Sequence, residues 1–171
     1  MKLISFDVES NCLHGKAFAI GAVVTDDTGL VAECAIRCPI KGRVNTWVAE
    51  HVLPAIADMP VTHPSYDDML EEFYHFLTHH KMGEDVKILT FIPWPVESNI
   101  LSDMYSRPGR EYGGPFPLID LATVLDTKVY NPISDEAYLN THGLSVPFEG
   151  AWHNPLYDAY AAAVIYRHLM V

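Results

Sequence analysis

The chain has 171 residues, a formal net charge of −11 and a hydrophobic fraction of 49%, which suit one compact domain and exclude an intrinsically disordered chain. The acidic charge argues against broad, non-specific adhesion to nucleic acid, but it does not exclude an enzyme that meets phosphates through bound cations. No apolar run approaches the roughly 20 residues of a membrane span, so we expect no membrane partner.

Three strands are predicted at the start of the chain. Apolar runs cover residues 3–8, 17–25 and 30–37, and the D-D-T-G sequence at residues 26–29 indicates a tight turn between the last two. We expect these strands to form an antiparallel meander at one side of a sheet.

Helices and strands then alternate. The pattern predicts helices over residues 46–53, 65–77 and 96–105, a buried strand over 86–92, a Gly/Pro-rich loop over 107–117, a short strand running into a helix over 117–125, and a last helix after Asn154. This order predicts an α/β fold with a mixed sheet. Because no repeat or linker interrupts it, we expect a single domain over residues 1–171.

The cysteines indicate a reducing compartment. Cys12, Cys34 and Cys38 are an odd, sparse set that does not make a disulfide framework, and we expect them to pack as small hydrophobic residues. The N-terminal sequence M-K-L-I-S-F-D-V-E has no long apolar segment and no cleavage site, so no secretory signal is expected. A cytoplasmic location follows as the expectation.

Two carboxylates mark the end of the first strand. Asp7 and Glu9 are two residues apart, so their side chains point to the same face. Two acids at a hydrated strand end would need no further explanation. Here, however, they follow an almost continuous apolar run, which places them at the C-terminal end of a buried strand, where open α/β sheets bind ligands.

The start of the last helix carries a histidine and a further acid. Asn154 is a good N-cap, Pro155 suits the first helical position, and Asp158 falls about one turn inside. The helix dipole alone could account for Asp158, and a surface loop could account for His153. Small residues then let the helix pack closely on a sheet and would press Asp158 towards the first strand: Ala159, Ala161, Ala162, Ala163 and Val164.

Together these motifs resemble the DEDDh 3′–5′ exonucleases. D-V-E matches the first family motif, D-x-E, and A-I-G-A-V fits the second strand. H-N-P-L-Y-D-A matches the third motif, H-x-A-x-x-D-A, with Pro155 in place of the usual alanine. The resemblance spans the whole chain and implies a ribonuclease-H-like mixed β-sheet flanked by helices.

The second family motif departs from the usual pattern. In F-I-P-W-P-V-E-S-N-I-L, Glu97 occupies the place of the aspartate, and Ile100 and Leu101 follow at the apolar places. The P-W-P-V-E form resembles small ribonuclease-T-like bacterial exoribonucleases. Asp103 is the rival on the same helix, but it lies about 9 Å further along the axis. By the same resemblance, Asp120 is expected to be structural and not a metal ligand.

The resemblance implies a two-metal site. Four carboxylates with a summed charge of −4 would be balanced by two divalent cations, Mg²⁺ or Mn²⁺, which prefer hard oxygen ligands. His153 would take the proton from the attacking water. The implied metal ligands are Asp7, Glu9, Glu97 and Asp158.

Contacts to the terminal nucleotide are expected from Asn11, Leu13 and His14, which follow the first motif. Trp94 could stack on a base, although packing in the core or at a subunit contact would also suit it. Arg107 and Arg110 could reach phosphates or simply lie in a solvated loop.

The leading hypothesis is a 3′–5′ exoribonuclease that releases nucleoside 5′-monophosphates from single-stranded 3′ ends. The alternatives are a 3′–5′ DNA exonuclease of the proofreading type and a non-catalytic nucleic-acid-binding module on the same fold. Relatives of this size suggest a homodimer, with exposed aromatics such as Tyr112 compatible with a contact between subunits.

Overall fold

A mixed sheet forms the centre of the protein in the computed structural model, which describes residues 1–82 and 85–170. The strand order is β3-β2-β1-β4-β5. The strands are β1 (Lys2–Ser10), β2 (Ala17–Asp26), β3 (Gly29–Arg37), β4 (Val86–Thr90) and β5 (Leu118–Asp120). β2 is antiparallel to both β1 and β3, whereas β4 is parallel to β1 and to β5. The predicted meander and the mixed sheet are therefore confirmed.

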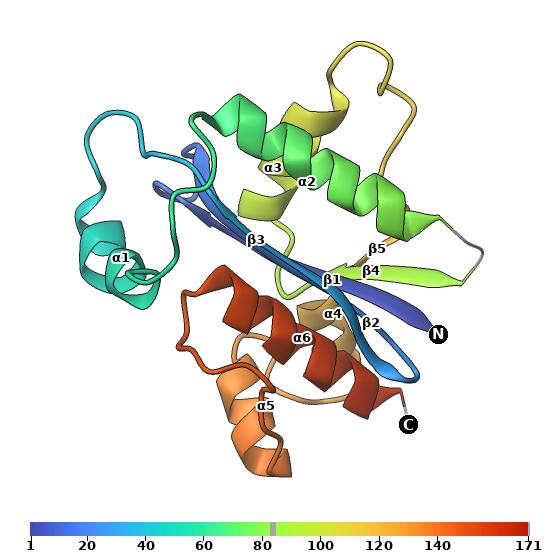
Figure 1. The fold of residues 1–171 in the computed structure, drawn as a ribbon. Helices are drawn as coiled ribbons and strands as arrows, with labels where there is room; N and C mark the ends of the chain where they lie inside the picture. The colour runs from blue at the N-terminus through green and yellow to red at the C-terminus, as the bar shows by residue number, and fades with distance from the viewer. Residues whose placement is uncertain (83–84, 171) are drawn as a thin grey trace.

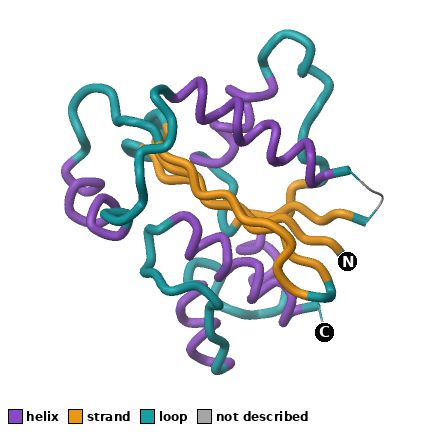
Figure 2. Tube along the Cα trace, in the orientation of Figure 1, coloured by secondary structure: helices purple, strands orange, loops and turns teal. Residues whose placement is uncertain are grey.

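Helices cover both faces of this sheet (Figure 1; Figure 2 shows the strands in orange between the helices). α2 (Tyr66–Lys81) and α3 (Val96–Tyr105) lie on one face, and α4 (Leu121–Thr127), α5 (Asp135–His142) and α6 (Pro155–Leu169) lie on the other. A π-helical turn, η1 (Val48–Val52), leads into the short α1 (Leu53–Ala55) beyond one end of the sheet. The helix expected over residues 46–53 is thus present, with a π-helical centre.

Helix α5 was not predicted from the sequence. Its caps are visible in the sequence in retrospect: the Ser134 side chain accepts a hydrogen bond from the Ala137 N–H, and Gly143 ends the helix at φ 63°. The apolar pattern of this segment is weak, because only Tyr138 and Leu139 are buried. A helix with so narrow an apolar face gives little periodicity to detect.

Two hydrophobic cores lie on the two faces of the sheet. On one face Phe6 of β1 packs against Phe73 of α2, with ring centroids 5.3 Å apart. On the other, Leu3 and Val23 join the buried alanines of α6. Strands β1 and β2 are therefore buried from both sides, which explains their continuous apolar runs.

Cys34 and Cys38 are buried and Cys12 is exposed, all as free thiols. Among the described residues, no helix is long and apolar enough to cross a membrane.

Candidate active site

The paired acids lie at the C-terminal end of β1, in the middle of the sheet. Asp7 is opposite Gly21 of β2, and Glu9 is opposite Ala19. Both side chains are only partly exposed. The predicted placement at the end of a buried strand is therefore correct.

Gly21 brings the start of α6 onto this part of the sheet. A Cβ atom at Gly21 would lie 2.1 Å from the backbone nitrogen of Leu156 and 2.2 Å from the carbonyl carbon of Pro155. These separations are too short for any side chain, so only glycine allows the helix to approach. The following alanines of α6 are also buried. This close packing carries Asp158 towards the acids of β1, as the small residues of the helix predicted.

His153 joins these acids from the turn before α6. Its backbone has φ 70°, and its N–H donates to Oδ2 of Asp158 at 3.0 Å. Its Nδ1 lies 3.7 Å from Oε1 of Glu9. Ligand atoms of Glu9, His153 and Asp158 all lie within 4.8 Å of one another. Residues from the first strand and from the last helix thus meet in one cluster.

Glu97 approaches from the first turn of α3. Its side chain is 5% exposed. Asp103, the rival on the same helix, instead accepts hydrogen bonds from Lys16 and from the Tyr66 hydroxyl, the latter at 2.8 Å. A buried acid without a cation suits a metal-binding role better than an acid already paired with lysine.

Burial and mutual repulsion shift the acids towards the protonated form. The pKa of Asp7 is raised well above its usual value by burial and then by Asp158 and Glu97. Burial, followed by repulsion from Glu9, also raises the pKa of Asp158. Burial raises the pKa of Glu97 to about 8. It likewise raises the pKa of Glu9, against the opposing influence of His153.

The pKa of His153 is itself raised, chiefly by its interaction with the Glu9 carboxylate. A further acid, Asp135, was not predicted from the sequence. It is the first residue of α5, and its charge also contributes to the raised pKa of His153. Burial raises the pKa of Asp135, and its charge contributes to the raised pKa values of Asp7 and Asp158. Only the S-D-E sequence of an N-cap could have pointed to this residue, and that pattern does not indicate a site.

A cavity of about 440 Å³ opens beside Glu9. Leu13, Asn45, Trp47 and Val96 are among the residues that line it. Trp47, which was not predicted as a site residue, stacks on His51 with ring centroids 4.9 Å apart and presents its ring edge-on to His153 at 5.0 Å. Leu13, one of the predicted nucleotide contacts, therefore lines this cavity.

The other predicted nucleotide contacts are near this cavity but do not line it. His14 and Trp94 face each other edge-on at 6.4 Å, and Trp94 is 69% exposed, which rules out packing in the core. The Asn11 amide donates to the Arg43 carbonyl at 2.9 Å and accepts from the Asn45 N–H at 2.8 Å. Asn11 therefore fixes the loop before η1, a role that the sequence did not predict.

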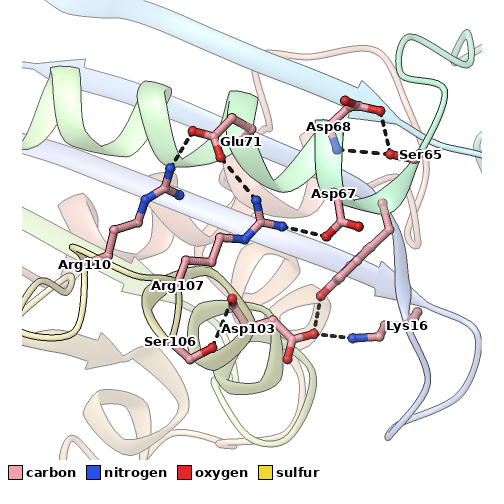
Figure 3. Close-up of polar contacts among 10 residues, drawn as sticks. Lys16, Ser65, Asp67, Asp68, Glu71, Asp103, Ser106, Arg107 and Arg110 are labelled. Carbon is pink, nitrogen blue, oxygen red and sulfur yellow. Dashed lines mark hydrogen bonds and ion pairs between the residues drawn. The ribbon is translucent and has the colours of Figure 1, made fainter.

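The remaining candidates have structural contacts. Asp120 caps α4 by accepting from the Thr123 N–H and hydroxyl, in agreement with the expected structural role. Arg107 and Arg110 pair with acids of α2 (Figure 3). Because these guanidinium groups are engaged within the fold, the loop does not hold free cations for phosphates.

The donor set fits a divalent cation. Oδ1 of Asp158 is buried and has no hydrogen-bond partner among the described residues. Such an atom is costly unless something else binds it. Carboxylate oxygens are the ligands that Mg²⁺ and Mn²⁺ prefer, and a cation would offset the repulsion between the acids. Glu9, His153 and Asp158 offer ligand atoms within 4.8 Å of one another for such an ion, and the charges of Asp158 and Glu97 help to raise the pKa of Asp7.

No family model matches the sequence, and no curated protein matches it either. Solved structures do match. The nuclease domain of 3′hExo, a DEDDh family member, bound to rAMP, has a TM-score of 0.71 and 15% identity over 99% of this chain and 91% of its own. Exonuclease X in complex with 5′ overhanging duplex DNA has a TM-score of 0.65 and 19% identity, covering 98% and 90%.

A third structure, a 3′-exonuclease in a study of 3′-end-specific recognition of histone mRNA stem-loop, has a TM-score of 0.65 and 13% identity, covering 99% of this chain and 80% of its own. The chain therefore has the ribonuclease-H-like fold of the DEDDh 3′-exonucleases, as its motifs predicted. At these identities the likeness establishes the fold, and the activity has to be argued from the site.

Proposed function

We propose that residues 1–171 form a single metal-dependent 3′–5′ exonuclease domain. One observation carries the proposal: Glu9, His153 and Asp158 come from opposite ends of the chain, yet their ligand atoms lie within 4.8 Å of one another. A binding module for nucleic acid has no use for buried, uncompensated acids. A metal-dependent phosphodiesterase needs them, because they hold cations against the substrate phosphate.

In this proposal Asp7, Glu9, Glu97 and Asp158 hold two divalent cations, Mg²⁺ or Mn²⁺. Bound cations supply charge stabilisation to the phosphate in the transition state and lower the pKa of a water molecule. His153 accepts a proton from the attacking water through its imidazole. The water oxygen bonds to phosphorus and the bond to the 3′-oxygen breaks. The leaving 3′-oxygen takes a proton from bulk water, and His153 returns its proton to the solvent. The product is a nucleoside 5′-monophosphate.

The cavity beside Glu9 is suited to the terminal nucleotide. Leu13 and Trp47 give it apolar walls on which a base can stack without sequence preference. We expect His14 and Trp94 to contact the next nucleotide, and Asn11 to act through the loop that it holds. RNA is the expected substrate, because P-W-P-V-E resembles the ribonuclease-T-like exoribonucleases. DNA is the alternative.

The decisive experiment offers 5′-end-labelled RNA and DNA, single- and double-stranded, with Mn²⁺ or with EDTA, and resolves the products. We expect a ladder shortened from the 3′ end, release of 5′-monophosphates, and no products in EDTA. His153→Ala should slow this hydrolysis strongly while metal binding stays measurable. Absence of metal-dependent cleavage of any substrate would leave the non-catalytic binding module as the function.

A homodimer and a cytoplasmic location complete the proposal. Tyr112 is fully exposed in the loop after α3 and is available to a partner subunit. Light scattering at several concentrations tests the dimer, and fractionation of cells that express a tagged chain tests the location.

A further inference from the structure

The loop between β3 and η1 carries two cations beside the candidate active site. Lys41 and Arg43 are exposed, and among the described residues neither side chain has an ion-pair or hydrogen-bond partner. The residue between them, Gly42, has φ 87°, a conformation that favours glycine. In Figure 1 this loop and α1 lie at the same end of the sheet as the start of α6.

The other lysines and arginines either bind groups within the fold or lie far from the candidate active site. The chain has 11 lysines and arginines. Arg37, Lys81 and Lys128 donate to backbone carbonyls. Four others pair with acids: Lys16, Arg107, Arg110 and Arg167. Lys2 and Lys87 lie at the starts of β1 and β4, the opposite end of the sheet from Glu9. In the part of the chain that the structure describes, Lys41 and Arg43 are thus the free lysine and arginine charges at the site end.

The loop is attached to the strand that holds the acids. Asn11, two residues after Glu9, binds the Arg43 carbonyl with its amide nitrogen and the Asn45 N–H with its amide oxygen. Asn45 in turn lines the cavity beside Glu9. Two side-chain hydrogen bonds therefore fix the backbone of this loop relative to the candidate active site.

Surface hollows continue from the cavity to these cations. One of about 370 Å³ is lined by Asn11, Arg43 and Asn45, and so shares Asn45 with the cavity beside Glu9. Another of about 170 Å³ is lined by Asn11 and Lys41, among others. A nucleic-acid strand that leaves the cavity past Asn45 would pass the side chains of Lys41 and Arg43.

We propose that Lys41 and Arg43 bind backbone phosphates of the nucleotides upstream of the one being removed. This inference rests on the proposed exonuclease function. A strand with one negative charge per nucleotide approaches a protein whose net charge is −11, so it needs local cations along its path. We therefore expect the enzyme to prefer a single strand of several nucleotides over a dinucleotide as its substrate.

The test compares a Lys41→Ala/Arg43→Ala double variant with the wild-type protein on a dinucleotide and on a single-stranded decanucleotide. We expect the decanucleotide-to-dinucleotide ratio of kcat/KM to fall by about tenfold, on the order of 1.4 kcal/mol. The salt dependence of decanucleotide binding should also become shallower, by about 0.7 in log–log slope for each lost phosphate contact.

A Lys2→Ala/Lys87→Ala double variant is the matched control, because it removes the same charge at the far end of the sheet. The decanucleotide-to-dinucleotide ratio of kcat/KM for this control should equal that of the wild type. An unchanged ratio in the loop variant would overturn the inference. Fluorescence anisotropy of a labelled decanucleotide separates the two proposals, since it needs no turnover. Without cleavage by the wild type the exonuclease proposal fails, whereas equal binding by the loop variant and wild type refutes the phosphate contacts.

Discussion

Two regions of the described structure gather acidic side chains, but only one of them pairs its acids with arginine side chains. Between α2 and α3, Arg107 binds Asp67 at 2.6 Å and Glu71 at 3.2 Å, and Arg110 also binds Glu71 (Figure 3). The hydrogen bond from Arg110 lowers the pKa of Glu71. These acids are balanced within the fold, so their role is structural.

The C-terminal end of β1 has the opposite character. Its acids are close together, and burial and repulsion raise their pKa values. Helix α3 contains both situations. Burial raises the pKa of Glu97, whereas at Asp103 the hydrogen bonds from Lys16 and Tyr66 outweigh burial and lower the pKa. Acids that lack a countercharge among the described residues therefore mark a candidate site for a cation from outside the fold.

Removal of one charge from each region should give opposite results. Asp158→Asn keeps the acceptor for the His153 N–H but loses a metal ligand, so we expect nuclease activity to fall by about a thousandfold or more. Its stability in EDTA should rise, because repulsion falls. Nucleotide release and thermal denaturation measure the two effects.

Glu71→Gln is the control in the paired region. We expect activity to persist and stability to fall by up to about 1 kcal/mol, since the ion pairs are partly exposed. Full activity of Asp158→Asn would show that this residue is not part of the active site. The contrast between the two regions would then no longer hold.

Gly21→Ala tests whether the close packing of α6 on β2 brings Asp158 to the unpaired acids at the C-terminal end of β1. The added methyl collides with the backbone of Pro155 and Leu156, so we expect a loss of about 1–3 kcal/mol of stability. We expect Mn²⁺ to raise the melting temperature of the wild type, and this increase should be lost in the variant.

Gly29→Ala is the matched control for this prediction. Gly29 has φ 127°, and a Cβ atom added there would meet no other atom within 4 Å, so the cost of the substitution is backbone strain away from the site. Its response to Mn²⁺ should be retained. An unaltered Mn²⁺ response in Gly21→Ala would show that the helix can shift without disturbing the acids.

The metal-free protein should lose stability as pH rises from about 5 to about 8. The pKa of Glu97 is raised to about 8 and those of Asp7 and Asp158 are also raised, so the folded state binds more protons than the unfolded chain in this window. Each excess proton lowers the free energy of unfolding by about 1.4 kcal/mol per pH unit. The raised pKa of His153 acts with the same sign.

Denaturant unfolding in EDTA across this pH range measures the effect. Added Mg²⁺ should give its largest stabilisation at the upper end, because metal binding requires deprotonated ligands. Stability that rises with pH in EDTA would mean that the acids are compensated within the fold after all.

The smallest expected effect concerns Trp47. Trp47→Leu removes the edge contact with His153 and the stack on His51, interactions worth about 0.5–1.5 kcal/mol each. We expect kcat to fall by about three- to tenfold, and Trp47→Phe to restore much of it. Equal rates for the leucine and phenylalanine variants would show that the aromatic contact does not position His153.

The sequence predicted most of the secondary structure and most of the candidate site residues, because these predictions depend on local patterns. Apolar runs specify β1 and β2, and Asn154 with Pro155 specifies the start of α6. Motif spacing placed Asp7, Glu9 and Asp158 at element ends that the fold brings together. Helix α5 was not predicted, because its apolar pattern is weak and its helical signal is confined to its caps.

Only the tertiary structure decided which charges are compensated. Nothing local tells that Asp103 meets Lys16 while Glu97 meets other acids, because the partners lie far apart in the chain. The same is true of Asp135, whose charge acts on His153 from α5, and of Trp47, whose ring packs edge-on against His153. Electrostatic energy depends on distance in space and on burial, and both are fixed only when the chain is folded.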